Sequence, residues 1–157
     1  MFHFLVALHV AAAIIFLGPV MLSTSTFQTK AKAAANGDAQ AAGGAQLMLR
    51  TTNLYGYLSL LVPLFGVTLL FSRWDHFKTM PQFHAALALS IIAWIILLVL
   101  IIPKQRKVAA SLGLLETDES DQADAVDNMP KALKQLSMLG GIFNGLWFIT
   151  LILMFVR

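Results

Sequence analysis

The stretch that decides the fold of this chain is residues 83–102, FHAALALSIIAWIILLVLII, which lies between Pro81 and Pro103. It contains no Asp, Glu, Lys or Arg. A helix needs roughly 20 apolar residues to cross a hydrocarbon core about 30 Å thick, and a charged side chain in that core is costly to desolvate. We therefore predict a transmembrane helix here.

Three other stretches have the same character, residues 4–27, 54–71 and 136–156, and none of them contains a charged side chain. The whole chain of 157 residues is 58% hydrophobic and only 12% charged, whereas a soluble domain carries about 25% charged residues. We predict one membrane domain over residues 1–157, an all-α four-helix transmembrane bundle in contact with the lipid bilayer.

The basic residues predict the orientation, because Lys and Arg accumulate in cytoplasmic loops. Eight of the eleven flank the first and third connections, and three lie on the other side. We expect the inner (plasma) membrane of a bacterium, with loops one and three cytoplasmic and both termini outside. No Lys or Arg precedes the first apolar run, which favours a retained helix over a cleaved signal peptide. The eight are Lys30, Lys32, Arg50, Lys104, Arg106, Lys107, Lys131 and Lys134; the three are Arg73, Lys78 and Arg157.

The connections contain signals for helix ends. The Ala-rich sequence after the first span predicts that this helix continues to about Ala35, and Asp38 can cap the next helix. Asp127 or Asn128 followed by Pro130 predicts the start of the last helix. The connection before that helix, residues 113–130, is acidic, which is typical of a solvated loop and leaves open a docking site for a basic partner. Its acids are Glu116, Asp118, Glu119, Asp121, Asp124 and Asp127.

Proline and glycine inside the spans predict kinks and close helix contacts. Gly18-Pro19 and Pro63 are expected to kink the first and second helices, because proline removes a backbone hydrogen bond. Such kinks serve packing, leave room for a ligand or provide a hinge.

The last span contains two pairs of residues at helix-packing spacing. Gly141 and Gly145 form a GxxxG pair, and Gly140 with Asn144 lies beside it. Small residues at this spacing let two helix backbones approach, and an amide can hydrogen-bond across the contact. The partner is either another helix of this bundle or a different protein.

Histidine is the one titratable residue type placed where chemistry could occur. The predicted topology brings His3, His9, His76 and His84 to the outer side, and the chain contains no cysteine. Imidazole binds haem iron, copper and zinc, so His9 and His84 are candidate ligands of such a group. The alternative is a structural hydrogen bond from His9 to a neighbouring helix. Small residues lie on both sides of the first helix, so the sequence leaves open which way His9 points.

Several short motifs resemble those of a bacterial family of four-span membrane proteins of unknown function, common in actinobacteria. The resemblance covers nearly the whole chain and implies no established activity. The small size of the chain also resembles that of accessory subunits of the actinobacterial cytochrome bc–cytochrome c oxidase supercomplex. A fainter resemblance to haem-binding four-helix membrane proteins of the protoporphyrinogen oxidase type lacks their later basic residues. The motifs are Leu8-His9-Val10, Phe16-Leu17-Gly18-Pro19, Tyr55-Gly56, Pro103-Lys104-Gln105-Arg106 and Gly141-Ile142-Phe143-Asn144-Gly145-Leu146-Trp147.

Together these observations favour a non-catalytic accessory or assembly subunit that packs against a larger membrane complex, and the resemblance implies a respiratory one. A haem- or metal-binding protein using His9 and His84 is the alternative, and a small oligomeric transporter is the second. The sequence predicts no resident cofactor for the favoured function. No catalytic constellation, phosphate-binding glycine loop or basic groove is present, so an enzyme and a nucleic-acid partner are not expected.

Overall fold

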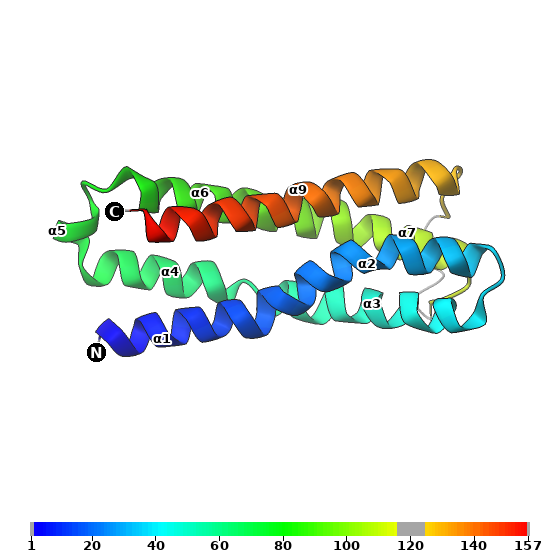
Figure 1. Cartoon of the computed structure of the whole chain (residues 1–157), viewed down its shortest axis with the longest axis horizontal. Helices are drawn as coiled ribbons and strands as arrows, with labels where there is room; N and C mark the ends of the chain where they lie inside the picture. The colour runs from blue at the N-terminus through cyan, green and yellow to red at the C-terminus, as the bar shows by residue number, and fades with distance from the viewer. Residues whose placement is uncertain (1, 116–124, 157) are drawn as a thin grey trace.

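The computed structural model describes residues 2–115 and 125–156 and shows a bundle of four long helices that run side by side (Figure 1). The helices are Phe2–Ala35, Ala39–Ser72, Pro81–Ser111 and Met129–Phe155, and each is long and apolar enough to cross a membrane. The described ranges contain no strand. The predicted all-α four-helix membrane bundle is therefore confirmed.

Three of the four helices are built from shorter segments. The first comprises α1 (Phe2–Ala12), η1 (Ala13–Leu17) and α2 (Gly18–Ala35), and the second comprises α3 (Ala39–Leu58) and α4 (Leu61–Ser72). The third comprises α6 (Pro81–Ile95), η2 (Ile96–Ile101) and α7 (Ile102–Ser111), whereas the fourth, α9 (Met129–Phe155), is continuous. The short helix α5 (Trp74–Phe77) lies between the second and third.

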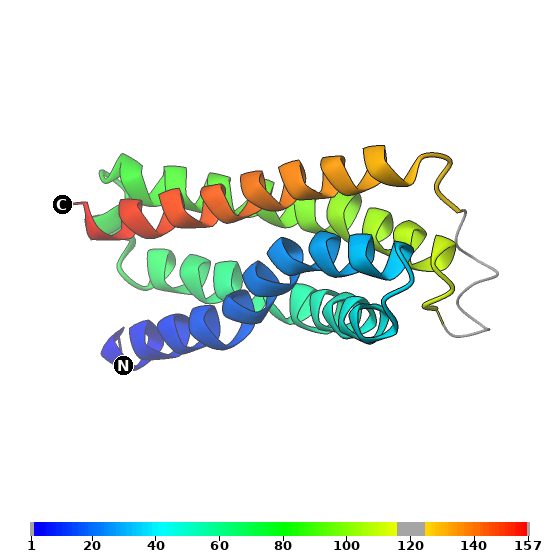
Figure 2. The same ribbon diagram turned by 45° about the vertical axis from the view of Figure 1, so that its right-hand side comes forward.

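The bundle has two different ends. We call the end with the start of α1, α5 and the end of α9 the terminal end, and the end with the α2–α3 connection and the start of α9 the loop end (Figures 1 and 2). The helices contain 27 to 34 residues, which at 1.5 Å per residue is about 40–50 Å. They are longer than the hydrocarbon core is thick, so parts of them extend beyond it.

The predicted helix ends at the loop end are confirmed. The first helix ends at Ala35, and the Asp38 side chain accepts a hydrogen bond of 3.0 Å from the backbone N–H of Ala41. The Asn128 side chain accepts one of 2.9 Å from the backbone N–H of Lys131 at the start of α9. Each cap satisfies an N–H group that has no partner inside its helix.

Most of the predicted acidic loop lies outside the described residues. This applies to Glu116, Asp118, Glu119, Asp121 and Asp124, so a solvated loop and a docking site for a basic partner both stay predictions. Asp127 lies within the described part and is exposed.

All five prolines lie within the first three residues of a helical segment. For Pro81 and Pro130 that segment begins a long helix, where a missing N–H costs least. Two of the segments are preceded by a π-helical turn, η1 before Pro19 and η2 before Pro103. A wider π-turn accommodates a proline ring that clashes with the carbonyl four residues earlier. The expected irregularity of the first helix at Gly18-Pro19 thus takes the form of a π-turn, and the path of the helix bends between α1 and α2 (Figure 1).

The second helix is interrupted at Ser59 and Leu60, just before the turn that contains Pro63. Because Pro63 has no N–H, the Ser59 carbonyl accepts from the Val62 N–H at 3.0 Å instead. The Gly56 carbonyl accepts from the Ser59 hydroxyl at 2.7 Å and from the Trp94 indole at 3.4 Å. Side chains thus satisfy backbone groups at the interruption, as the bilayer interior requires.

Packing differs between the two ends. Towards the loop end, α2 packs against both α3 and α9, and α7 packs against α3 and α9. Side chains such as Phe27, Leu97, Ile101, Leu136 and Phe143 are almost completely buried there. Towards the terminal end, the main contacts join α1 to α4 and α6 to α9. The bundle is therefore tightly packed on one side of the interruption and consists of two helix pairs on the other.

Candidate ligand-binding cavity

A cavity of about 860 Å³ lies between the two helix pairs of the terminal half, with walls from α1, α4, α6 and α9. None of the described residues that line it is Asp, Glu, Lys or Arg. Its surface is mostly aliphatic and aromatic, with a few polar atoms between. Ligand sites commonly have volumes of about 300–1,000 Å³ and this kind of lining, so the cavity is the strongest candidate site in the described part of the chain.

The wall of the cavity includes exposed apolar side chains of the first helix and of α9. Ile14 on η1, the continuation of α1, and Phe148 on α9 both line the cavity, yet they are 69% and 61% exposed. Val10 and Leu151 on the same two helices behave in the same way. The cavity therefore has an apolar rim along the side of the bundle.

Aromatic side chains close the cavity at the terminal end. Phe2 stacks on Phe77 with ring centroids 6.3 Å apart, and Phe77 meets Phe83 edge-on at 4.9 Å; all three line the cavity. The guanidinium carbon of Arg73 lies 4.2 Å from the centre of the Phe2 ring, a cation–π contact. This cluster separates the apolar interior from the end of the bundle.

His9 lies in the wall of the cavity, about 10 Å along the helix from Phe2 at 1.5 Å per residue. Its Nδ1 forms a hydrogen bond of 3.0 Å with the backbone carbonyl of Val62 on α4. The His9 side chain thus points into the bundle, a direction that the sequence left open. The predicted structural hydrogen bond from His9 to a neighbouring helix is present.

Gly66 makes room for the His9 ring. A Cβ atom added at Gly66 would lie 3.8 Å from Nδ1 of His9 and only 3.3 Å from Cε1, which is a tight contact. The absence of a side chain at this position, one turn after Pro63, therefore lets the imidazole approach α4 closely enough to reach the Val62 carbonyl.

The other polar side chains of the cavity wall are Ser90, Thr150 and Trp147. The hydroxyls of Ser90 and Thr150 donate to the backbone carbonyls of Leu87 and Leu146 of their own helices. The indole Nε1–H of Trp147 is buried and has no hydrogen-bond partner in the structure. It is thus an unsatisfied donor beside an apolar cavity.

The other histidines are placed differently from His9. His84 is exposed, its Nδ1 lies 3.1 Å from the Met80 carbonyl, and its ring meets Trp74 edge-on at 6.1 Å. His84 is not among the residues that line the cavity with His9. His3 and His76 are exposed near the same end. Among the described residues, no group of three or more His, Cys, Asp or Glu side chains is arranged to hold a metal ion.

The two small-residue pairs of α9 face in different directions. A Cβ atom at Gly140 would lie 2.7 Å from the backbone carbonyl oxygen of Thr24, and the Asn144 amide donates to the Ser25 hydroxyl at 2.6 Å. This pair therefore packs against α2 within the bundle. Gly141 and Gly145 are exposed and would have no atom within 4 Å of an added Cβ.

The remaining predicted site residues surround the cavity. Gly18 and Pro63 line it, from α2 and α4. Pro19 follows Gly18 in the first turn of α2, after the π-turn that allows the helix to bend. The sequence left open whether these kinks serve packing, make room for a ligand or provide a hinge. The cavity beside them favours room for a ligand.

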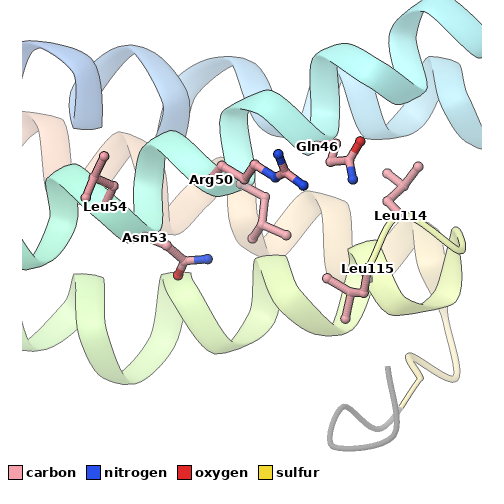
Figure 3. Close-up of a pocket in the computed structure, with 7 residues that line it drawn as sticks. Gln46, Arg50, Asn53, Leu54, Leu114 and Leu115 are labelled. Carbon is pink, nitrogen blue, oxygen red and sulfur yellow. The ribbon is translucent and has the colours of Figure 1, made fainter. Parts of the chain in front are cut away.

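A second pocket, of about 240 Å³, lies near the loop end and has different chemistry. Figure 3 shows Gln46, Arg50 and Asn53 of α3 on one side of it and Leu114 and Leu115, which follow α7, on the other. It is smaller and more polar than the cavity that contains His9, and it has a basic side chain in its wall.

Comparison of the chain with models of known protein families, with curated proteins and with solved structures finds no match.

Proposed function

We propose that the protein binds a lipid-soluble small molecule inside the membrane, in the cavity that contains His9. The observation that carries this proposal is the cavity of about 860 Å³, whose apolar wall includes exposed side chains of the first helix and of α9. Protein interiors are normally packed as densely as organic crystals. An apolar space of this size next to a tightly packed half-bundle therefore indicates an occupant that the chain itself does not supply.

The composition of the wall defines the occupant further. A charged ligand would lose its hydration without gaining a counter-charge from the described wall, which is unfavourable in an apolar environment. A neutral, largely apolar molecule loses little, because it exchanges one apolar environment for another with closer packing. The proposal is one of binding rather than catalysis, with the ligand arriving from the bilayer.

The distribution of basic residues along the chain suggests on which side of the membrane the cavity lies. Eight of the eleven basic residues flank the connections at the loop end, and the positive-inside rule places that end in the cytoplasm. In this orientation the cavity lies at the level of the outer leaflet of the plasma membrane. The ligand then belongs to the lipid-soluble molecules of that leaflet.

Tryptophan fluorescence provides a direct test, because Trp147 is 7% exposed and lies in the cavity wall. The double variant Trp74→Phe, Trp94→Phe leaves Trp147 as the single tryptophan of the chain. In lipid nanodiscs, the brominated hydrocarbon 9,10-dibromooctadecane is expected to quench Trp147 saturably, because the number of cavities is limited.

The matched control retains Trp94 in the variant Trp74→Phe, Trp147→Phe. Trp94 is half-buried, donates to Gly56 and is not a cavity residue. The quenching of Trp94 should rise gradually with the amount of hydrocarbon in the bilayer and should not saturate at a low ratio of hydrocarbon to protein. If Trp147 follows the same unsaturated course as Trp94, no binding in the cavity occurs and the proposal is wrong.

A second function, that of an accessory subunit of a larger membrane complex, is favoured by the outward direction of Gly141 and Gly145. These glycines leave a shallow strip on α9 beside the exposed side chains of Met138 and Ile142. Such strips allow the backbone of another transmembrane helix to approach closely. The respiratory supercomplex is the candidate complex that the sequence resemblance suggests, and it stays a prediction.

Extraction in several mild detergents followed by mass spectrometry tests the accessory function. The chain is expected to migrate with a larger complex, and the double variant Gly141→Leu, Gly145→Leu is expected to lose this association. Both positions are exposed, so the bundle itself should remain folded. Migration of the wild-type chain alone in every detergent would count decisively against this function.

A further inference from the structure

Two polar atoms in the cavity wall have no partner within the described part of the chain, and they differ in kind. One is a nitrogen of His9 on α1, and the other is the indole N–H of Trp147 on α9. Both lie about 10–12 Å from the terminal ends of their helices, at 1.5 Å per residue. The indole nitrogen has almost no accessible surface, whereas the His9 ring lies in the cavity wall, so a ligand in the cavity meets the His9 nitrogen.

The hydrogen bond to Val62 determines which nitrogen of His9 is available. A carbonyl oxygen can only accept, so Nδ1, which lies 3.0 Å from it, must carry the proton. In the neutral imidazole the other nitrogen, Nε2, then has a lone pair and acts as an acceptor. The ring edge with Nδ1 and Cε1 faces Gly66, which leaves Nε2 as the ring nitrogen free to meet a ligand.

Trp147 differs from His9, because its indole N–H can only donate and is enclosed by protein atoms. The side chain is 7% exposed and its ring meets Phe143 edge-on, with centroids 6.3 Å apart. Within the described part of the chain, nothing around the indole accepts its proton. A ligand in the cavity therefore packs against the Trp147 side chain and leaves its N–H without a partner.

We infer that the ligand is a lipid-soluble alcohol or phenol whose hydroxyl group donates to Nε2 of His9, an inference that rests on the proposed function. A hydroxyl is the simplest neutral group that can donate to this acceptor. Ethers, esters and ketones only accept, so they offer nothing to His9. Hydrocarbons offer nothing either.

A pair of molecules that differ only in the hydroxyl proton tests this inference. Geranylgeraniol and its methyl ether are titrated against 9,10-dibromooctadecane on the single-tryptophan Trp147 protein in nanodiscs, and the recovery of fluorescence is measured. The alcohol is expected to compete at about fivefold to tenfold lower concentration than the ether, the factor that one net hydrogen bond provides.

The variant His9→Phe keeps a ring at this position and removes Nε2. It is expected to reduce the preference for the alcohol to within about twofold, while the ether competes as it does with the wild-type residue. Unchanged competition by the ether shows that the cavity has kept its shape. The protein that retains His9 is tested for its preference for the alcohol over the ether in a separate titration, so that result stands even if the variant does not fold.

The outcomes that overturn the inference are distinct from those that overturn the proposed function. Equal competition by alcohol and ether, or no competition by either against a saturable hydrocarbon signal, contradicts the hydroxyl contact and leaves the cavity as a binding site. Absence of a saturable signal contradicts both. A Soret absorption band in the purified protein that His9→Phe abolishes would assign Nε2 to haem iron instead, and the hydroxyl contact would be wrong.

Discussion

Replacement of Gly140 with alanine is expected to destabilise the bundle by about 1–3 kcal/mol, the usual cost of overpacking a tight contact. The added Cβ atom would lie 2.7 Å from the Thr24 carbonyl oxygen, which belongs to the backbone of α2 and cannot rotate away. Helices α2 and α9 would have to separate, and the hydrogen bond between Asn144 and Ser25 would be strained with them.

Gly141→Ala is the matched control for this prediction, because the two glycines are neighbours on the same helix. An added Cβ at Gly141 meets no atom within 4 Å. This variant should be neutral or more stable by up to about 1 kcal/mol, since alanine favours the helix more than glycine does. The free energy of unfolding in mixed detergent micelles measures both changes. Equal effects of the two substitutions would show that Gly140 is not at the contact with α2.

Replacement of Ala13 with phenylalanine is expected to weaken hydrocarbon binding at least about tenfold, because the new side chain occupies space that a ligand of this size requires. Ala13 is half-buried and lines the cavity at the start of η1. The saturable quenching of Trp147 should disappear or shift to much higher hydrocarbon concentration. Filling an apolar void should leave the stability of the bundle unchanged or increase it.

Ala11→Phe provides the control, with the same substitution two residues away on an exposed side of the first helix. Ala11 is not among the cavity residues, so quenching should remain as in the parent protein. A loss of binding in both variants would point to general damage to the first helix. Retention of binding in both would show that the hydrocarbon lies elsewhere.

Much of the fold could be predicted from the sequence because its signals are local. Four charge-free runs predict the spans. Asp38 predicts one helix start and Asp127 or Asn128 predicts another, and the structure shows hydrogen bonds from Ala41 to Asp38 and from Lys131 to Asn128. These features depend on the cost of burying charge and on unpaired N–H groups at a helix start. Both are properties of a few consecutive residues.

The cavity could not be predicted, because it depends on how far two helix pairs separate. Pro63 signalled an irregularity in the second helix, but the interruption itself lies at Ser59 and Leu60, before the proline. The direction of His9 was equally undetermined, since small residues lie on both sides of the first helix. The structure places His9 half-buried against α4, where its ring lies close to Gly66. Gly66 was a usable signal, because a glycine near a proline can accommodate a large side chain from a neighbouring helix.

The glycine motif of the last helix illustrates a second limit of sequence patterns. Gly140 with Asn144 and Gly141 with Gly145 have the same spacing, and they lie on adjacent faces of one helix. Spacing alone cannot decide which pair meets a neighbour. Packing against α2 selects Gly140, and the exposed Gly141 pair is left for lipid or another protein.

The most direct test of ligand binding in the cavity is mass spectrometry of the lipid-soluble molecules that remain with the purified protein. After extensive detergent exchange, organic extracts of the wild-type, Ala11→Phe and Ala13→Phe proteins are compared at equal protein concentration. The wild-type and Ala11→Phe proteins are expected to retain the same neutral, hydroxyl-bearing molecule in a near-stoichiometric amount, and the Ala13→Phe protein is expected to lack it. Identical extracts from all three proteins, containing only the lipids of the bulk membrane, would contradict the binding of a ligand in this cavity.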